Sequence, residues 1–554
     1  MLMVSRAENQ EAADRFWELA LAMEIKGDRW RSSSYLKASS SIEELAEPLQ
    51  IISERGELRR IEGVGESIAA KLNELLSTGR IEALEAVRDL LPEDLPIFRD
   101  APVLGLGAIA ELVSNLDVRS VDALLRALDE GVLSTNIRIG EDAERRIKEW
   151  LVWRREEAAE VPTPYALRSA ERVLTCMQEG GIVSRIELSG PARRKVAAVA
   201  NITLLFASPT PELAIAKFGT CPEITELTVV ERDLAVGKTS SGAGCMLRQV
   251  TEQRFALENF RRTGPQAHVD EVLSALEARY GPLSAEEGPF STEAEIYGAA
   301  GQELVPEEMR DRGRPYDGVV AKTDLLGDLR VRSILTDGSI NVEMMAEAAA
   351  SIGHSYICLC DRLGRRVDGE TLARRNDMVD EADARSPVTL LKGIEVNIAP
   401  DGKLEAPPSL LEDMDLVIAS VNTKLDMGED GMRARILHAL DDPCMDVLGH
   451  PCGRVLGLRE RVIQDLRPIA ERAAERKVAL EINAHPDRQD LDDNDAYGLY
   501  ELGAFYSLGT DSACPLKPQD WDWAVSMVRR AGLEPQRMLN VLPPHALQQR
   551  EWRK

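Results

Sequence analysis

Long apolar runs are absent from this sequence. No apolar run in the 554-residue chain reaches the roughly 18 residues that a membrane-spanning helix needs. The opening segment, MLMVSRAENQEAADRFW, also lacks the uninterrupted apolar core of a secretory signal peptide. We therefore expect a cytoplasmic protein that has no membrane partner.

Positive charge and a cysteine framework are lacking too. The chain has 67 lysines and arginines against 94 aspartates and glutamates, which gives a formal net charge of −27. Such a molecule repels nucleic acid at long range, so any contact with DNA must be made by a local patch. The eight cysteines lack the regular spacing of a disulfide framework. We expect them to be reduced thiols, many of them buried.

The chain does have enough apolar residues for several cores. They make up 44% of the sequence, and 554 residues are too many for one hydrophobic core. In the carboxy-terminal part, short apolar segments such as LLKGIEV and VALEINA alternate with helical patterns. This alternation is typical of a parallel α/β arrangement in which functional groups lie at the ends of the strands.

One segment indicates a family. VLGHPCGRVLGLRE, residues 447–460, resembles the segment that carries a metal-binding histidine in bacterial family X DNA polymerases with a carboxy-terminal PHP (polymerase and histidinol phosphatase) domain. His450 matches that histidine, and the resemblance extends along essentially the whole chain. It implies a multidomain α and α/β fold with helix-hairpin-helix domains, a polymerase-β-like palm and thumb, and a PHP domain that forms a distorted (β/α)7 barrel.

The resemblance also implies a division into five domains. In active members, the palm adds nucleotides and the PHP domain hydrolyses phosphoesters, and both reactions use divalent metals. The expected domains are an amino-terminal helical domain with the first helix-hairpin-helix motif at 1–85, a fingers-like helical domain with a second motif at 86–160, a palm-like (nucleotidyltransferase-like) domain at 161–255, a thumb-like domain at 256–318 and the PHP domain at 319–554.

The amino-terminal region has a thin basic patch. Apolar side chains from Phe16 onward have helical spacing and, on their own, predict an amphipathic helical domain. In the family, basic and aromatic residues of this domain meet a DNA end, and Lys26, Arg31, Tyr35 and Lys37 match them in type. The serines that follow Arg31 stand where the family usually has another basic residue.

Two segments place glycines directly before a helix. Glycine lets the backbone turn with positive φ and expose N–H groups, and the helix start adds its dipole, so such a motif can hold a phosphate without reading bases. We interpret both as helix-hairpin-helix motifs; ordinary glycine-turned helix pairs are the alternative. The glycines are Gly63 and Gly65 in LRRIEGVGESIAAKLNELLSTGR (58–80), and Gly105 and Gly107 in APVLGLGAIAELVSNL (101–116).

The segment RIELSGPARRKVAAVANITLLFAS resembles the palm motif of the family. There, a Gly-Ser pair and two arginines precede a strand with two aspartates at alternate positions, so that both carboxylates lie on one face and hold two Mg²⁺ ions. Here Arg193 and Arg194 remain, but Asn201 and Thr203 replace the aspartates. The third carboxylate, expected near Met246, is also missing. An amide and a hydroxyl cannot neutralise a metal pair that is bridged by a triphosphate.

The PHP resemblance implies nine ligands for three divalent metals, and the missing ligands are all histidines. Histidine gives a metal a neutral nitrogen lone pair, whereas arginine stays protonated and has none to give. We therefore expect no metal site of the family kind. The positions that lost their histidine are Arg330, Arg332, Arg362, Asn422 and Ala513, and the retained ligand positions are Asp337, Glu395, His450 and Asp511.

Without metals, the retained acids would repel one another where they converge. We expect the three arginines to act as structural counterions, because a guanidinium can pair with a carboxylate through two hydrogen bonds. One alternative is that some of them point outward and bind a phosphate. A second is a new zinc site, because Cys360, His450, Cys452 and Cys514 fall at or after strand ends; buried thiols are the simpler interpretation.

These patterns favour a DNA-binding, repair-associated protein that lacks polymerase and phosphoesterase activity. Its expected partners are the DNA backbone, contacted without sequence preference, and other repair proteins. No cofactor is expected. Two alternatives stay open: a scaffold for protein partners that no longer binds DNA, and an enzyme with a rebuilt site. The second would use Mg in a polymerase, or Mn or Zn in a PHP phosphoesterase with Asp337, Glu395, His450 and Asp511 as candidate ligands.

Overall fold

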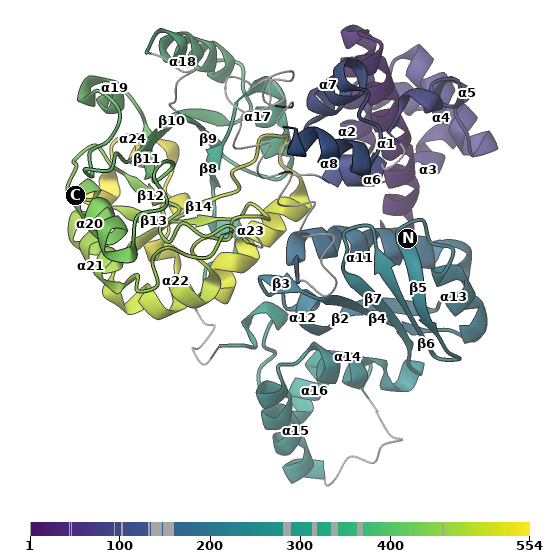
Figure 1. Ribbon diagram of the computed structural model, residues 1–554. Helices are drawn as coiled ribbons and strands as arrows, with labels where there is room; N and C mark the ends of the chain where they lie inside the picture. Colours follow the sequence, from purple (N-terminus) through teal and green to yellow (C-terminus); the bar gives the residue numbers. More distant parts are fainter. Residues whose placement is uncertain are drawn as a thin grey trace. The chain divides into compact units, whose positions relative to one another are not determined.

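A computed structural model of the chain describes most of its length in two compact units (Figure 1). The first contains 1–161, 165–189 and 200–255, and the second contains 162–164, 190–199 and 256–554. Within the described ranges, no helix is both long and apolar enough to cross a membrane. The described residues are 2–43, 45, 47–92, 95–100, 104–130, 133, 147, 160–280, 290–312, 318–333, 342–362, 369–456 and 459–554.

The first unit begins with a series of helices that bury an apolar core. Phe16, Leu19 and Ala20 lie on one side of the first helix and are buried, as their helical spacing predicts. Ser120 caps the last of these helices by accepting a hydrogen bond from the N–H of Ala123. The helices are α1 (Leu2–Ile25), α2 (Arg29–Glu43), α3 (Leu49–Glu54), α4 (Glu66–Thr78), α5 (Glu82–Glu85), α6 (Leu95–Asp100), α7 (Leu106–Leu116) and α8 (Val121–Asp129).

A five-stranded sheet completes the first unit. Its strand order is β2-β4-β7-β6-β5, with β4 and β7 parallel and the other neighbours antiparallel. The edge strand β5 is exposed along most of its length, and its register with β6 is irregular. The elements of this region are β1 (Val161–Pro162), α11 (Thr163–Gln178), β2 (Arg185–Ser189), β4 (Asn201–Ala207), α13 (Pro211–Phe218), β5 (Ile224–Val230), β6 (Leu234–Thr239) and β7 (Gly244–Gln249).

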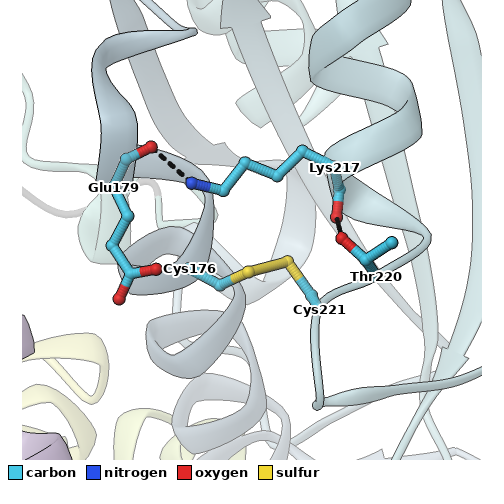
Figure 2. Close-up of a disulfide and its surroundings, with 5 residues drawn as sticks. All are labelled: Cys176, Glu179, Lys217, Thr220 and Cys221. Atoms are coloured by element: carbon cyan, nitrogen blue, oxygen red, sulfur yellow. Dashed lines mark hydrogen bonds between the residues drawn. A yellow bond between two sulfur atoms is a disulfide. The ribbon is translucent and has the colours of Figure 1, made fainter. Parts of the chain in front are cut away.

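Two cysteines of the first unit form a disulfide, which corrects the expectation that all eight are reduced thiols. Cys176, near the end of α11, is bonded to Cys221, which lies between α13 and β5 (Figure 2). The two residues are 45 positions apart in sequence, with Cα atoms 6.0 Å apart. Their spacing could not predict the bond, because the fold brings together two segments that are far apart in sequence.

The second unit starts with helices that share a core of their own. Phe260, Val272, Ile296 and Tyr297 are fully buried in this core. The elements are α12 (Gly190–Arg193), β3 (Ala198–Val199), α14 (Phe255–Thr263), α15 (Gln266–Tyr280) and α16 (Glu293–Ala300).

A seven-stranded sheet forms the rest of the second unit. Every pair of neighbouring strands is parallel, and the strands lie in chain order from β8 to β14. The strands are β8 (Gly327–Val331), β9 (Tyr356–Arg362), β10 (Thr389–Asn397), β11 (Leu416–Ser420), β12 (Val447–Gly449), β13 (Ala479–Asn483) and β14 (Phe505–Gly509). The helices are α17 (Val342–Ser351), α18 (Gly369–Asp383), α19 (Pro408–Glu412), α20 (Glu429–Ala439), α21 (Arg467–Arg476), α22 (Asp493–Leu499), α23 (Pro518–Arg530) and α24 (Pro544–Gln548).

The first and last strands of this sheet approach each other and nearly close a barrel. Val331 forms a parallel bridge with Ser512, just beyond β14. The N–H of Arg332 donates to the carbonyl of Ser512 at 2.8 Å, and the N–H of Asp511 donates to the carbonyl of Arg330 at 2.9 Å. The expected parallel α/β barrel is therefore confirmed, and the ends of its strands meet in one region.

Candidate functional site

The centre of the barrel holds one buried arginine surrounded by carboxylates. Arg330 lies on β8, and its side chain is only 1% exposed. Its Nη1 donates to Oε1 of Glu481 at 2.6 Å, and its Nη2 donates to Oε2 of Glu395 at 2.6 Å. Its Nε donates to Oδ1 of Asp511 at 3.1 Å. One guanidinium thus joins acids that come from β10, β13 and the end of β14.

The other replacements for lost histidines also donate to these acids. Arg332 forms a bidentate pair with Asp511, at 2.6 Å and 2.9 Å. Arg362, at the end of β9, donates from Nε to Oε2 of Glu395 at 3.3 Å. Asn422, just after β11, donates from Nδ2 to Oε1 of the same carboxylate at 3.1 Å. Both oxygens of Glu395 and both oxygens of Asp511 therefore accept hydrogen bonds from the protein itself.

The arginines decide the charge state of two of the three carboxylates. Burial would raise the pKa of both Glu395 and Asp511, but the Arg330 guanidinium, helped by Arg362 at Glu395 and by Arg332 at Asp511, holds each pKa well below its ordinary value. At Glu481, burial outweighs the attraction of Arg330, so the pKa of that carboxyl is raised. Three guanidiniums and three carboxylates leave this cluster close to neutral.

His450 is turned toward the same guanidinium. It follows β12 with a φ of 53°, which is uncommon for a residue with a side chain. Its Nε2 lies 3.3 Å from Nη2 of Arg330, which can only donate, and its Nδ1 lies 3.3 Å from Oε2 of Glu481. Burial, Arg488 and Arg330 hold the pKa of His450 well below its ordinary value, so the ring is neutral. The lone pair of Nε2 is therefore directed at Arg330.

Strand β4, whose sequence resembles the palm motif, carries no carboxylate where that resemblance implies two aspartates. Asn201 and Thr203 lie on β4, two residues apart, on its less buried face. On the parallel neighbour β7, Gly244 pairs with Asn201 and Met246 pairs with Thr203. This register places Met246 beside Thr203, and β7 contains no acidic residue.

Arg193 and Arg194, in the second unit, are paired with acids. Arg193 contacts Glu293 at the start of α16, and its Nη2 lies 2.5 Å from Oε1 of Glu307. Arg194 donates from Nε to Oδ2 of Asp311 at 3.2 Å. These contacts fix both arginines within the second unit.

The glycine motifs have open helix starts, but only one glycine has the expected conformation. Gly63 has a φ of 73°. Gly65 caps α4 with φ −81° and ψ −179°, and Gly105 caps α7 with φ −73° and ψ 166°. The expectation of positive φ is wrong for these two, because a glycine directly before a helix serves as an extended N-cap. It is also wrong for Gly107, which lies inside the first turn of α7. A Cβ atom at Gly65 or Gly107 would meet open space.

The basic residues of the amino-terminal patch are partly neutralised. Lys26 is exposed in the turn after α1. Arg31 lies 3.5 Å from a carboxylate oxygen of Asp28, and Lys37 lies 2.7 Å from a carboxylate oxygen of Glu62 in the first glycine hairpin. Tyr35, which matches the family in type, is instead 9% exposed and packs against a buried phenylalanine of α1. Its helix turns it toward the core, so it is not available to a DNA end.

Comparison with known proteins shows similarity over almost the whole chain. The model of the family described as "Helix-hairpin-helix domain" matches residues 7–81. The DNA polymerase/3'-5' exonuclease PolX of Bacillus subtilis (strain 168) is 26% identical over 553 residues, which cover 94% of this chain and 95% of that protein. The chain is therefore similar to PolX along almost its whole length. The expected helix-hairpin-helix domain and family resemblance are therefore confirmed.

Shorter similarities agree with the barrel. A probable phosphatase of Thermoanaerobacter sp. (strain X514) is 26% identical over 206 residues, covering 35% of this chain and 82% of that protein. The probable phosphatase YcdX of Escherichia coli O139:H28 is 26% identical over 169 residues, covering 29% of this chain and 66% of that protein. The seven-stranded parallel near-barrel of the PolX-like chain is accordingly a PHP-like domain.

The side chains at the barrel mouth do not fit the divalent metals that a PHP domain implies. A cation in contact with Glu395, Glu481 and Asp511 together would have to sit where the guanidinium of Arg330 lies. In the part of the chain that the structure describes, no three His, Cys, Asp or Glu side chains are arranged to hold a metal ion. Asp337 lies outside the described residues, and Ala513 has no donor atom. The charged side chains that surround these acids are protonated arginines, which have no lone pair to give to a metal.

The four side chains of the alternative zinc site do not form a metal-binding group either. Cys360 is fully buried in the apolar core of the barrel, and the thiol of Cys452 donates to the carbonyl of Asp490 at 2.6 Å. Cys514 is exposed. These thiols do not form a metal-binding group with His450 among the described residues.

Sequence reasoning missed some members of the cluster. Glu481 and Asn483 lie on β13, and Nδ2 of Asn483 donates to Oδ2 of Asp511 at 3.2 Å. Asp328, on β8, accepts hydrogen bonds from the backbone N–H groups of Arg330 and Thr510. The sequence did contain a signal for these residues. Each is a polar side chain inside a short apolar strand, ALEIN or GDLRV, and a buried polar side chain needs a hydrogen-bond partner.

Proposed function

We propose that this PolX-like chain binds DNA through its helix-hairpin-helix motifs and acts in DNA repair without polymerase or phosphoesterase activity of its own. The observation that carries the proposal is the position of Arg330, whose guanidinium occupies the centre of the carboxylate cluster at 2.6–3.1 Å. A protonated arginine offers no lone pair and cannot deprotonate at physiological pH, so it cannot replace a metal-activated water.

The palm-like region supports the same conclusion. In-line attack on an α-phosphate needs two metal ions held by carboxylates on one strand face. The corresponding face carries Asn201, Thr203 and Met246. Neither an amide, a hydroxyl nor a thioether brings the negative charge that a metal pair needs, so this strand is expected to keep its structural role only.

Contact with the DNA backbone is supported by the glycine motifs. The starts of α4 and α7 have N-cap glycines, and a Cβ atom added at Gly65 or Gly107 would meet nothing within 4 Å. Backbone N–H groups at an open helix start can hold a phosphate, and such contacts carry no sequence preference. The net charge of −27 confines this contact to a local site.

Binding is tested with a duplex that contains a one-nucleotide gap, at several salt concentrations. The double variant Gly65→Ala and Gly107→Ala is expected to weaken binding at least about tenfold, because the added methyl groups occupy the space in which a phosphate must approach a helix start. Neither glycine has a positive φ, so the variant should keep its fold. Gly428→Ala is a matched control, because Gly428 also caps a helix, has a φ of −62° and has no atom near its missing Cβ.

Two results would contradict the DNA-binding part of this function. One is equal binding by the native chain and the double variant. The other is no salt-dependent binding by the native chain, which would favour a scaffold for protein partners. For the chemistry, purified chain is supplied with gapped DNA, nucleotides and Mg²⁺, Mn²⁺ or Zn²⁺. We expect no nucleotide addition and no release of nucleotides or phosphate. Activity that disappears in Glu395→Gln would instead indicate a rebuilt metal site.

A further inference from the structure

Helix α11 and the segment between α13 and β5 are joined covalently. The disulfide connects Cys176 and Cys221 (Figure 2), and β5 begins three residues later at Ile224. Cys221 sits in a turn in which its own N–H donates to the carbonyl of Phe218 at 3.2 Å and its carbonyl accepts from the N–H of Ile224 at 2.9 Å. The bond therefore anchors the beginning of an edge strand to α11.

Contacts that do not involve sulfur hold the same two segments together. Arg172, about one turn before Cys176 on α11, donates from Nη1 to Oε2 of Glu223 at 3.0 Å. The other oxygen of that buried carboxylate accepts from the hydroxyl of Ser240 at 2.6 Å. Figure 2 also shows Lys217, at the end of α13, donating to the carbonyl of Glu179 just after α11. Breaking the disulfide would leave these contacts in place.

The two bonded cysteines differ in their exposure to solvent. Cys221 is 2% exposed, whereas Cys176 is half-buried. A dissolved thiolate can therefore reach Cys176 more easily than Cys221. Thiol–disulfide exchange proceeds by attack on one sulfur and departure of the other, so access selects which mixed disulfide forms.

We propose that Cys176 and Cys221 are a reversible redox modification site that exchanges with small-molecule thiols and disulfides. In oxidation, the Cys176 thiolate attacks a small-molecule disulfide and releases one small thiol. The Cys221 thiolate then attacks Cys176 and releases the second small thiol. The protein loses two electrons and two protons, and the small disulfide gains them as two thiols. Reduction runs the same steps in reverse.

Reversibility follows from the contacts that survive reduction. The Arg172–Glu223 pair and the Lys217 contact keep the two thiols near each other, so re-formation of the bond is an intramolecular step at high effective concentration. What changes is the anchoring of β5. This strand is exposed and irregularly paired with β6, so its backbone is expected to exchange amide hydrogens faster when the bond is broken.

The other cysteines provide internal controls. Burial raises the pKa of Cys245 to about 12, and the thiols of Cys358 and Cys452 are also buried with their pKa values raised by burial. These thiols are poor nucleophiles. Cys514 is exposed and is not part of the disulfide, so its reaction with an alkylating agent shows that the reagent is active.

The test uses the full chain in buffers that hold defined ratios of reduced and oxidised glutathione, followed by alkylation and mass spectrometry. We expect Cys176 and Cys221 to be cross-linked at the oxidised end, alkylated at the reduced end and cross-linked again after return. Cys514 should be alkylated in every buffer, except in those molecules in which it carries a small-molecule adduct. Alkylation of both Cys176 and Cys221 at the oxidised end, or a bond that does not re-form, would overturn the proposal.

A variant tests the preorganisation separately. Arg172→Met removes the ion pair but leaves both cysteines, and we expect re-formation of the bond to slow roughly three- to tenfold, since the effective concentration of the thiols falls. Cys514→Ser should leave that rate unchanged. An Arg172→Met chain that re-forms the bond at the native rate would overturn the role of the surviving contacts. Equal amide exchange of β5 in both redox states would overturn the anchoring role.

Discussion

Arg332 and Asp511 form a bidentate ion pair, in which Nε donates to Oδ1 at 2.6 Å and Nη2 donates to Oδ2 at 2.9 Å. The same Oδ1 also accepts from Arg330 at 3.1 Å. Asp511 is held in the left-handed region with a φ of 53°. A residue in that conformation is maintained by its surroundings, and here two guanidiniums hold its carboxylate. Both arginines stand where the family resemblance implies metal-binding histidines.

Arg330→Met should destabilise the barrel strongly. The change leaves Glu481 buried without its guanidinium partner and removes one of the guanidiniums that face Glu395 and Asp511. Removing one partner from a buried ionic network costs about 3–5 kcal/mol in the free energy of unfolding. Urea unfolding of the native chain and the variant at pH 7 measures the difference.

Arg374→Met is the matched control for that change. Arg374 lies on α18, its side chain is 70% exposed, and its partner Glu370 is 81% exposed. An exposed pair of this kind contributes little, so the variant should unfold within about 0.5 kcal/mol of the native chain. Loss of less than about 1 kcal/mol in Arg330→Met would contradict the structural role of the central arginine.

Asp328→Asn should change the pH dependence of stability on the neutral side. Burial raises the pKa of Asp328 to about 7 from 3.8, against the hydrogen bonds from Thr510. A carboxyl whose pKa is raised on folding stabilises the protein fully below pH 3.8 and loses this contribution as the pH rises through 7. The difference between these two pKa values corresponds to about 4 kcal/mol. The asparagine variant should therefore lose less stability between pH 4 and pH 7 than the native chain.

The measurement is the urea midpoint at intervals across that range. Because Glu481 also has a raised pKa, the native slope contains more than one group, and the comparison between the two chains isolates Asp328. Parallel curves for the native chain and the variant would show that Asp328 titrates normally in the folded protein.

His354→Phe should change the pH dependence of stability on the acidic side. Burial, helped by Lys322, lowers the pKa of His354 to about 4, and its ring lies 4.4 Å from that of Trp521. Neither ring nitrogen has a hydrogen-bond partner in the described ranges. A histidine of this kind stabilises the fold fully above pH 6.5, and that contribution is lost as the pH falls through 4. The phenylalanine variant should lose less stability on acidification, and thermal unfolding at pH 7 and pH 4.5 measures it. An equal loss of stability in the native chain and the variant between pH 7 and pH 4.5 would contradict a buried, neutral ring at His354.

The sequence was sufficient for the barrel because its strands are short, apolar and separated by helical patterns. Segments such as LLKGIEV and VALEINA became β10 and β13, and parallel pairing then brought the ends of the strands together. The motif positions of Arg330 and Arg362 could likewise be read from the chain. Their partners could be read only in part, because Glu395 and Asp511 lie at expected ligand positions whereas Glu481 does not.

The features that the sequence did not predict depend on contacts between segments that are far apart in the chain. Arg330 and Glu481 are 151 residues apart, and no local pattern specifies that their side chains meet. The disulfide of Cys176 was missed for the same reason, since 45 residues separate it from Cys221. The conformation of Gly65 was predicted wrongly because one residue type serves two roles, a left-handed turn and an extended helix cap, which the sequence alone does not separate.

The metal content of the purified chain tests most directly whether guanidiniums have replaced the cations of the barrel. The chain is incubated with Mn²⁺ and Zn²⁺, freed of unbound metal by gel filtration, and analysed by mass spectrometry of its metals beside Glu395→Gln. We predict well below one metal ion per chain in both proteins, and no change in thermal unfolding after addition of a chelator. One or more ions per native chain, lost in Glu395→Gln, would contradict the replacement.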